Sequence, residues 1–135
     1  MLRPLRLISA LLIVLCTACG SSKPLSDEAA SAVSANRMVV SEMPVAVQSQ
    51  SAYELISQYN PQWLSKRGRS SINNPVPIKV YLDGVTSAYG TVRSLRRISA
   101  RDIAVIEHFT ASEAQFKFGL GNTSGGILVH TRSGR

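Results

Sequence analysis

The chain is poor in the side chains on which many active sites depend. Its 135 residues include two histidines, His108 and His130, and two cysteines, Cys16 and Cys19. A zinc site needs such residues clustered at short spacings, which these four do not offer. The sequence also lacks a Gly-x-Ser-x-Gly nucleophile motif and a phosphate loop ending in Gly-Lys-Ser/Thr. We therefore expect no enzymatic activity: no catalytic residue, no metal and no cofactor.

Long apolar segments are also missing. The run from Leu7 to Leu15 is too short to cross a bilayer, which takes about 20 apolar residues, and no later segment comes closer. Arg3 and Arg6 precede this run, and Thr17-Ala18-Cys19 follows it. A basic start, a short apolar segment and a small residue before a cleavage site are the parts of an export signal. We therefore expect residues 1–18 to be a signal peptide that is removed on export.

The cysteine at the cleavage site makes this segment resemble a bacterial lipoprotein signal peptide. Ala18 matches the small residue that such signals place before the cysteine, whereas Cys16 stands where Leu is usual. The resemblance implies a mature chain that begins at Cys19 and carries acyl chains there. Gly20, in place of Asp, implies anchoring at the outer membrane, facing the periplasm or the cell surface. The alternative is an ordinary secretory signal that contains two cysteines.

Acidic residues are scarce, and the chain is basic. Lys and Arg number 15 against 8 Asp and Glu; after loss of Arg3 and Arg6 the mature 117 residues keep 13 basic side chains and a net charge of +5. Such a protein suits lipid phosphates, acidic glycans or an acidic protein face, and we expect no nucleic acid as partner. The alternative is that the charges only solvate the surface. They gather in two clusters: Arg93, Arg96, Arg97 and Arg101, and Lys66, Arg67 and Arg69.

Composition divides the mature chain at about residue 50. Residues 19–50 are rich in Ser and Ala and have no apolar stripe to bury, so we expect a flexible, disordered tether. Within it, Met38–Val40 and Val45–Val47 are short apolar patches separated by Pro44, and one of them suits an edge strand. Residues 51–135 are long enough for one small α+β domain.

The first half of this domain is predicted to be helical. Ser51 and Glu54 form a capping box that begins a helix, and Pro61 ends it. Proline also suits the first position of a second short helix, Pro61 to Lys66, which carries Trp63 toward the core. A loop follows.

The second half is predicted to contain three strands and one more helix. Alternation and β-branched residues predict strands at Ile78–Leu82, Ile103–Thr110 and Ile127–Thr131. A helix is expected over Ala111–Phe118: Ser112 and Glu113 favour its start, and Phe116 is expected to pack inward. The loop after it holds glycines suited to unusual dihedral angles: Gly119, Gly121, Gly125 and Gly126.

Three blocks in this half resemble the plug domain of TonB-dependent outer-membrane receptors. Val80–Val85 resembles a strand and turn of those plugs, and Asp102–Glu107 a block in which Asp-Ile leads into Ile-Glu. Phe118-Gly119 and Gly125–Arg132 resemble the block that closes the plug. The blocks keep family order and spacing within residues 51–132. The resemblance implies a plug-like fold with a short mixed sheet and two or three short helices.

The sequence departs from the family in ways that shape the functional hypothesis. Thr110–Ser112 replaces the usual Gly-Pro, and no clear segment for engaging TonB is found near the mature N-terminus. The chain ends at Arg135, so we expect a plug-like domain without the receptor's membrane strands.

The resemblance therefore implies a non-catalytic, lipid-tethered module that binds another envelope protein. It predicts an apolar or basic patch and an unpaired sheet edge. One alternative is a ligand-handling accessory of TonB-dependent transport, which predicts a concave polar pocket. Another is a truncated receptor remnant.

Overall fold

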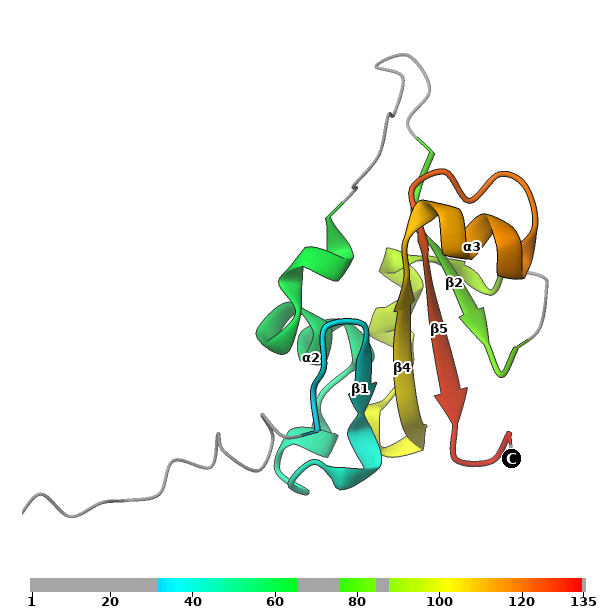
Figure 1. Cartoon of the computed structure of the whole chain (residues 1–135). Coiled ribbons are helices and arrows are strands. Elements are labelled where there is room, and N and C mark those ends of the chain that lie inside the picture. Colours follow the sequence, from blue (N-terminus) through cyan, green and yellow to red (C-terminus); the bar gives the residue numbers. More distant parts are fainter. Residues whose placement is uncertain (1–31, 66–75, 85–87, 135) are drawn as a thin grey trace, which may run out of the picture.

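A five-stranded mixed sheet organises the protein. The computed structural model describes residues 32–65, 76–84 and 88–134. The strand order is β1-β4-β5-β2-β3, with helices on both faces of the sheet (Figure 1). β2 and β5 are parallel, and the other neighbouring strands are antiparallel. This confirms the predicted small α+β domain. The strands are β1 (Arg37–Val39), β2 (Lys79–Leu82), β3 (Gly90–Thr91), β4 (Ile103–Phe109) and β5 (Gly126–Thr131).

Two capped α-helices and several 3₁₀ helices join the strands. The Ser51 hydroxyl accepts a hydrogen bond from the Glu54 amide at 3.3 Å, and the Glu54 carboxylate accepts one from the Ser51 amide at 2.8 Å, which confirms the predicted capping box. Thr110 and Glu113 form the same motif at the second helix, whose bounds are those predicted from the sequence, although the capping residue is Thr110 and not Ser112. The α-helices are α2 (Ala52–Tyr59) and α3 (Ala111–Phe118); the 3₁₀ helices are η1 (Val40–Glu42), η2 (Val47–Ser49), η3 (Pro61–Leu64), η4 (Val92–Arg97) and η5 (Ala100–Asp102).

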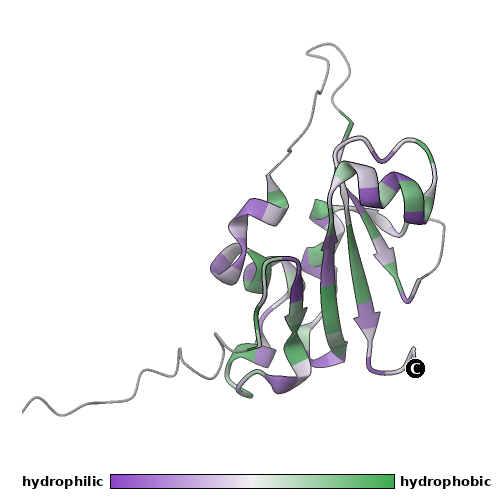
Figure 2. Ribbon diagram, viewed as in Figure 1, coloured by the Kyte–Doolittle hydropathy of each residue, from purple (hydrophilic) through white to green (hydrophobic). Residues whose placement is uncertain are grey.

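The main core lies between one face of the sheet and the layer formed by α2, η3 and η4. β4 and β5 are the most hydrophobic strands in Figure 2, and they point Ile106, Ile127 and Val129 into this core. Trp63 is 1% exposed, stacks on His108 with ring centroids 5.5 Å apart, and donates from Nε1 to the Ala35 carbonyl at 3.1 Å. The predicted interior position of Trp63 is therefore confirmed.

The domain begins earlier in the chain than we expected. Residues 32–50, which the sequence assigned to the tether, pack against the sheet, and Met38 and Val40 are fully buried. β1 is an edge strand antiparallel to β4, as one of the two apolar patches suggested. The tether prediction was wrong for these residues because a few apolar side chains, spaced too irregularly to form a stripe, are buried by 3₁₀ turns and one short strand. The rest of the predicted tether, 19–31, lies outside the described residues.

α3 covers part of the other face of the sheet. Phe118 stacks on Tyr81 with centroids 3.8 Å apart and meets Phe109 edge-on at 5.5 Å. The loop after α3 returns close to β4, since a Cβ on Gly125 would lie 2.6 Å from the Phe109 carbonyl oxygen. Gly125 also has φ +88°, so the predicted need for glycine here is confirmed.

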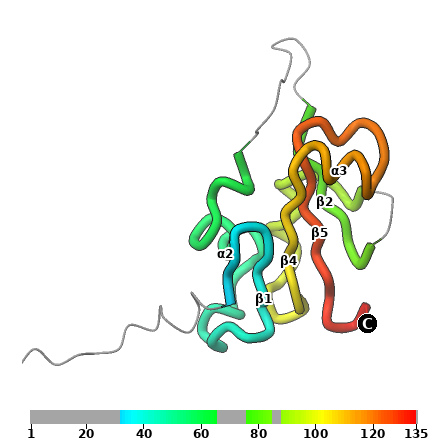
Figure 3. Tube along the Cα trace, in the orientation of Figure 1, coloured from blue at the N-terminus to red at the C-terminus, as the bar shows by residue number. Residues whose placement is uncertain are grey.

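The start of the described chain and α3 lie at opposite ends of the sheet. The Val39 amide donates to the Ala32 carbonyl at 2.8 Å, and Val39 pairs with Val105 near the start of β4. The described chain therefore begins at the end of the sheet opposite α3, as the traces in Figures 1 and 3 show. Within the described ranges, we find no helix with the length and apolarity needed to span a membrane.

Candidate functional site

The most exposed apolar side chains of the described domain lie at the end of α3. Phe116 is 95% and Leu120 is 91% exposed. The prediction that Phe116 packs inward was wrong. Ala114 and Phe118 lie four residues apart and share the face that packs on the sheet, whereas Phe116 falls midway between them on the opposite face. We call Phe116, Lys117 and Leu120 the α3 surface.

This surface is held in place by aromatic packing and charge. The Lys117 ammonium lies 4.3 Å from the centre of the Phe109 ring and 3.9 Å from the Glu107 carboxylate. Glu107 also meets Arg37 at 3.8 Å and His130 at 3.5 Å. Three basic side chains thus converge on one carboxylate beside α3. Arg37 and Lys117 together exceed the single negative charge of Glu107, and Lys117 directly follows the exposed Phe116 in α3.

The structure places the two histidines on opposite faces of the sheet. His108 lies on the core face of the sheet against Trp63, whereas His130 lies on the opposite face beside Glu107. The Asp83 carboxylate accepts hydrogen bonds from the amide and hydroxyl of Thr131, the latter at 2.8 Å. In the parts of the chain that the structure describes, no three Cys, His, Asp or Glu side chains are placed to share a metal ion.

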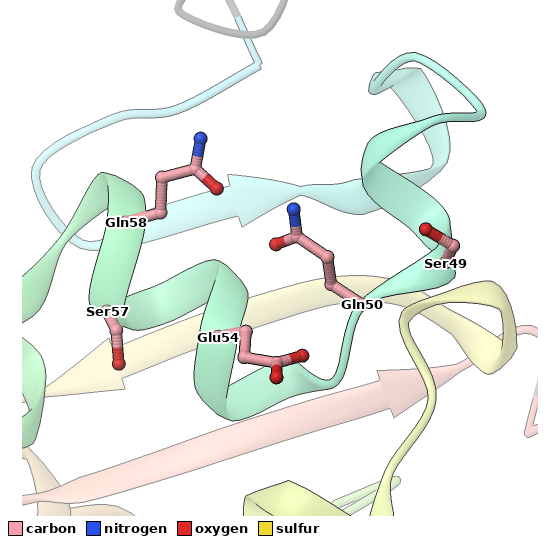
Figure 4. Close-up of a pocket in the computed structure, with 5 residues that line it drawn as sticks. All are labelled: Ser49, Gln50, Glu54, Ser57 and Gln58. Atoms are coloured by element: carbon pink, nitrogen blue, oxygen red, sulfur yellow. The ribbon is translucent and has the colours of Figure 1, made fainter.

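A second feature is a shallow polar hollow between α2 and the segment that leads into it. Its volume is about 520 Å³ (Figure 4). The Gln50 side-chain oxygen is buried there without a hydrogen-bond partner. Hydrogen bonds from Ser51 lower the pKa of the neighbouring Glu54 and keep its carboxylate charged. The hollow therefore offers amide, hydroxyl and carboxylate groups to a polar ligand. Its lining residues are Ser49, Gln50, Glu54, Ser57 and Gln58.

The first arginine cluster lies on η4 and η5, and its members are all exposed. Leu95, Ile98 and Ala100 are buried between them, so the cluster sits on an anchored segment of the fold. The Arg96 guanidinium lies 4.3 Å from the centre of the Tyr53 ring. We call Arg93, Arg96, Arg97 and Arg101 the arginine face; the second predicted cluster, Lys66, Arg67 and Arg69, lies outside the described residues.

The sheet offers little edge for strand addition. Val33 bridges to Met38, and the Ser34 amide donates to the Arg37 carbonyl at 2.7 Å, so the chain itself covers the outer side of β1. β3 is two residues long. The unpaired edge that the binding hypothesis predicted is therefore not found at β1.

Comparisons with known proteins leave the family open. No protein-family model, curated protein or solved structure matches the chain significantly. Cys16 and the predicted lipid-attachment residue Cys19 lie outside the described residues.

The sequence analysis did not predict the α3 surface. Phe116 is two residues from both Ala114 and Phe118, and this spacing, which is visible in the sequence, places Phe116 on the opposite side of the helix from them.

Proposed function

We propose that this chain is a non-catalytic lipoprotein module of the outer membrane, tethered through acylated Cys19, whose plug-like domain binds another envelope protein. The α3 surface is the observation that carries the proposal. Phe116 on α3 and Leu120, two residues after the helix ends, are almost fully exposed, and α3 is anchored by the Phe118–Tyr81 stack. Single exposed apolar residues are common, but two large ones close in sequence at the end of an anchored helix favour an interface.

The chemistry of this surface indicates the kind of partner. Burial of each apolar side chain contributes about 1.5–3 kcal/mol, and their rigid support lowers the ordering cost of binding. Lys117 beside them favours a partner whose apolar pocket has an acidic rim. The position of α3, at the end of the sheet away from the start of the described chain, leaves this surface accessible to a partner when the domain is tethered.

Site-specific photo-crosslinking in the native envelope tests the proposal. The crosslinking residue replaces exposed Ser112 on α3, and as a control it replaces exposed Gln58 on α2. We expect an adduct of one defined mass from position 112 and none of that mass from position 58. The double variant Phe116→Ser, Leu120→Ser should lose the adduct while its melting temperature stays unchanged. Equal adducts from both positions, or an adduct that survives the double variant, would contradict the proposal.

The polar hollow supports a second candidate, a role in holding a nutrient or metal chelate for TonB-dependent transport. The lining of the hollow is the observation that favours it, because amide, hydroxyl and carboxylate side chains surround one open space of a size that suits a small polar ligand. Melting shifts with ferric citrate as the probe test this role. A shift in the parent that disappears in Gln50→Met would support it. The absence of a shift at millimolar chelate would count against it.

A further inference from the structure

The arginine face is a fixed part of the domain surface. η4 and η5 together place four guanidinium groups over a short stretch, and the buried residues Leu95 and Ile98 hold that stretch against the core. The Ala100 amide also donates to the Gln50 carbonyl at 2.9 Å. The four arginines are therefore exposed on one anchored stretch of chain, which suits binding to an extended anionic surface.

These arginines are available for an external anion. Within the described ranges, the ion pairs converge on Glu107, and none of them involves a residue of the arginine face. Arg96 lies over the Tyr53 ring and near Glu54, and Asp102 is the acidic residue in the same segment. Arg93, Arg97 and Arg101, which form no ion pair with a described carboxylate, are suited to bidentate contacts with phosphate.

We propose that the arginine face docks on the phosphate groups of anionic phospholipids in the membrane that holds the protein. The proposal rests on the proposed tether at Cys19. Twelve residues lie between Cys19 and Ala32, so the two are thirteen residue steps apart and, at about 3.3–3.6 Å per step, at most about 47 Å. The domain is thereby confined next to a phosphate-bearing surface. Each basic side chain near such a surface strengthens binding about fivefold.

Docking of the arginine face on the membrane fixes the direction in which the α3 surface faces. η5 comes just before β4 and α3 just after it, so the two elements lie at opposite ends of that strand (Figure 1). η5 also contacts η2, close to where the described chain begins. η4 begins level with the other end of the strand, because Thr91 pairs with Lys79 beside Gly126. It is therefore Arg97 and Arg101, at the η5 end, whose contact with lipid turns the α3 surface away from the membrane and toward a partner.

Vesicle co-sedimentation tests this inference without the acyl anchor. The mature chain carrying Cys19→Ala is mixed, at low ionic strength, with vesicles of equimolar phosphatidylcholine and phosphatidylglycerol, or of phosphatidylcholine alone. The test variant is Arg97→Gln, Arg101→Gln. The control variant of equal net charge is Arg37→Gln, Lys79→Gln, which removes basic groups from the opposite face of the sheet. Melting curves verify that both variants are folded.

We expect the parent to bind only the vesicles that contain phosphatidylglycerol. The affinity should fall at least about tenfold in the Arg97 and Arg101 variant and less than about twofold in the control. Equal losses in the two variants, or no binding of the parent to anionic vesicles, would overturn the inference; the latter result points to an acidic protein face. Neither result bears on Cys19 or on the crosslink from α3, so failure here is distinct from failure of the proposed function.

Discussion

At the scale of single residues, Gly125 is under two constraints at once. Its φ of +88° lies in the region that favours glycine, and a Cβ would meet the Phe109 carbonyl oxygen. Gly119 shares the positive φ, at +87°, but a Cβ there would meet nothing within 4 Å. Alanine substitutions at the two glycines therefore compare the cost of backbone conformation alone with the cost of conformation plus a steric clash.

We predict that Gly125→Ala lowers the free energy of unfolding by about 3 kcal/mol or more, and Gly119→Ala by about 1 kcal/mol. The difference arises because the Phe109 carbonyl belongs to the sheet and cannot move aside cheaply. Urea denaturation of the two variants measures this difference in the free energy of unfolding. Equal losses would show that the loop relaxes around the added methyl group.

The two capping boxes make the free energy of unfolding depend on pH in the acidic range. Hydrogen bonds from Ser51 to Glu54, and from Thr110 to Glu113, lower the pKa of each carboxyl group below its ordinary value of 4.5. The ionised carboxylates therefore stabilise the folded state above that value, and the contribution is lost as the pH falls through the lower, folded-state pKa.

We expect the urea midpoint to fall between about pH 5 and pH 3, and to fall less in the double variant Glu54→Gln, Glu113→Gln. Midpoints measured at matched ionic strength check this. A double variant with the same pH dependence as the parent would assign the acid sensitivity to other carboxyl groups.

The burial or capping role of some residues could be predicted from the sequence, and that of others could not. Ser51 and Glu54 have the spacing of a capping box, and Trp63 has the bulk of a core residue, so both were predicted correctly. Phe116 was placed inward on its hydrophobicity, although the helical angle points it away from the sheet. Hydrophobicity predicts burial only when the periodicity agrees with it.

At the scale of elements, β1 and the turns after it complete the core. Met38 and Val40 are fully buried, and Met43 and Val47 are 3% and 8% exposed. At about 1.5–3 kcal/mol each, these four side chains contribute about 6–12 kcal/mol, which is comparable to the whole stability of a small domain.

A chain that begins at residue 51, the boundary predicted from the sequence, should therefore not fold, whereas one that begins at residue 32 should. Far-ultraviolet circular dichroism with thermal melting distinguishes them: we expect a cooperative transition only for the longer chain. A cooperative transition in the shorter chain would show that β1 is dispensable.

The arrangement of the strands is the part of the fold that the sequence left unspecified. β2, β4 and β5 were each predicted within a residue or two, because alternation is a local signal. The parallel pairing of β2 with β5 joins Lys79 to Gly126, and nothing local to either strand specifies it. The α3 surface likewise depends on a helix docked across Tyr81 and Phe109, which local pattern alone does not reveal.

At the scale of the whole molecule, the account joins a membrane anchor to a folded binding domain. The described domain supplies two surfaces at different places, the arginine face on η4 and η5 and the α3 surface beyond β4. Their separation is useful only if the protein is held at a membrane. Acylation of Cys19 is therefore the central claim on which the geometry of docking depends.

The most direct test is the intact mass of the protein purified from membranes, beside a Cys19→Ala variant. The account predicts a mass equal to residues 19–135 plus acyl chains, and release of the variant from the membrane in high salt, which screens the arginine face, since no long apolar segment replaces the lost lipid. A mature mass without lipid, or an uncleaved chain that stays membrane-bound without Cys19, would contradict it.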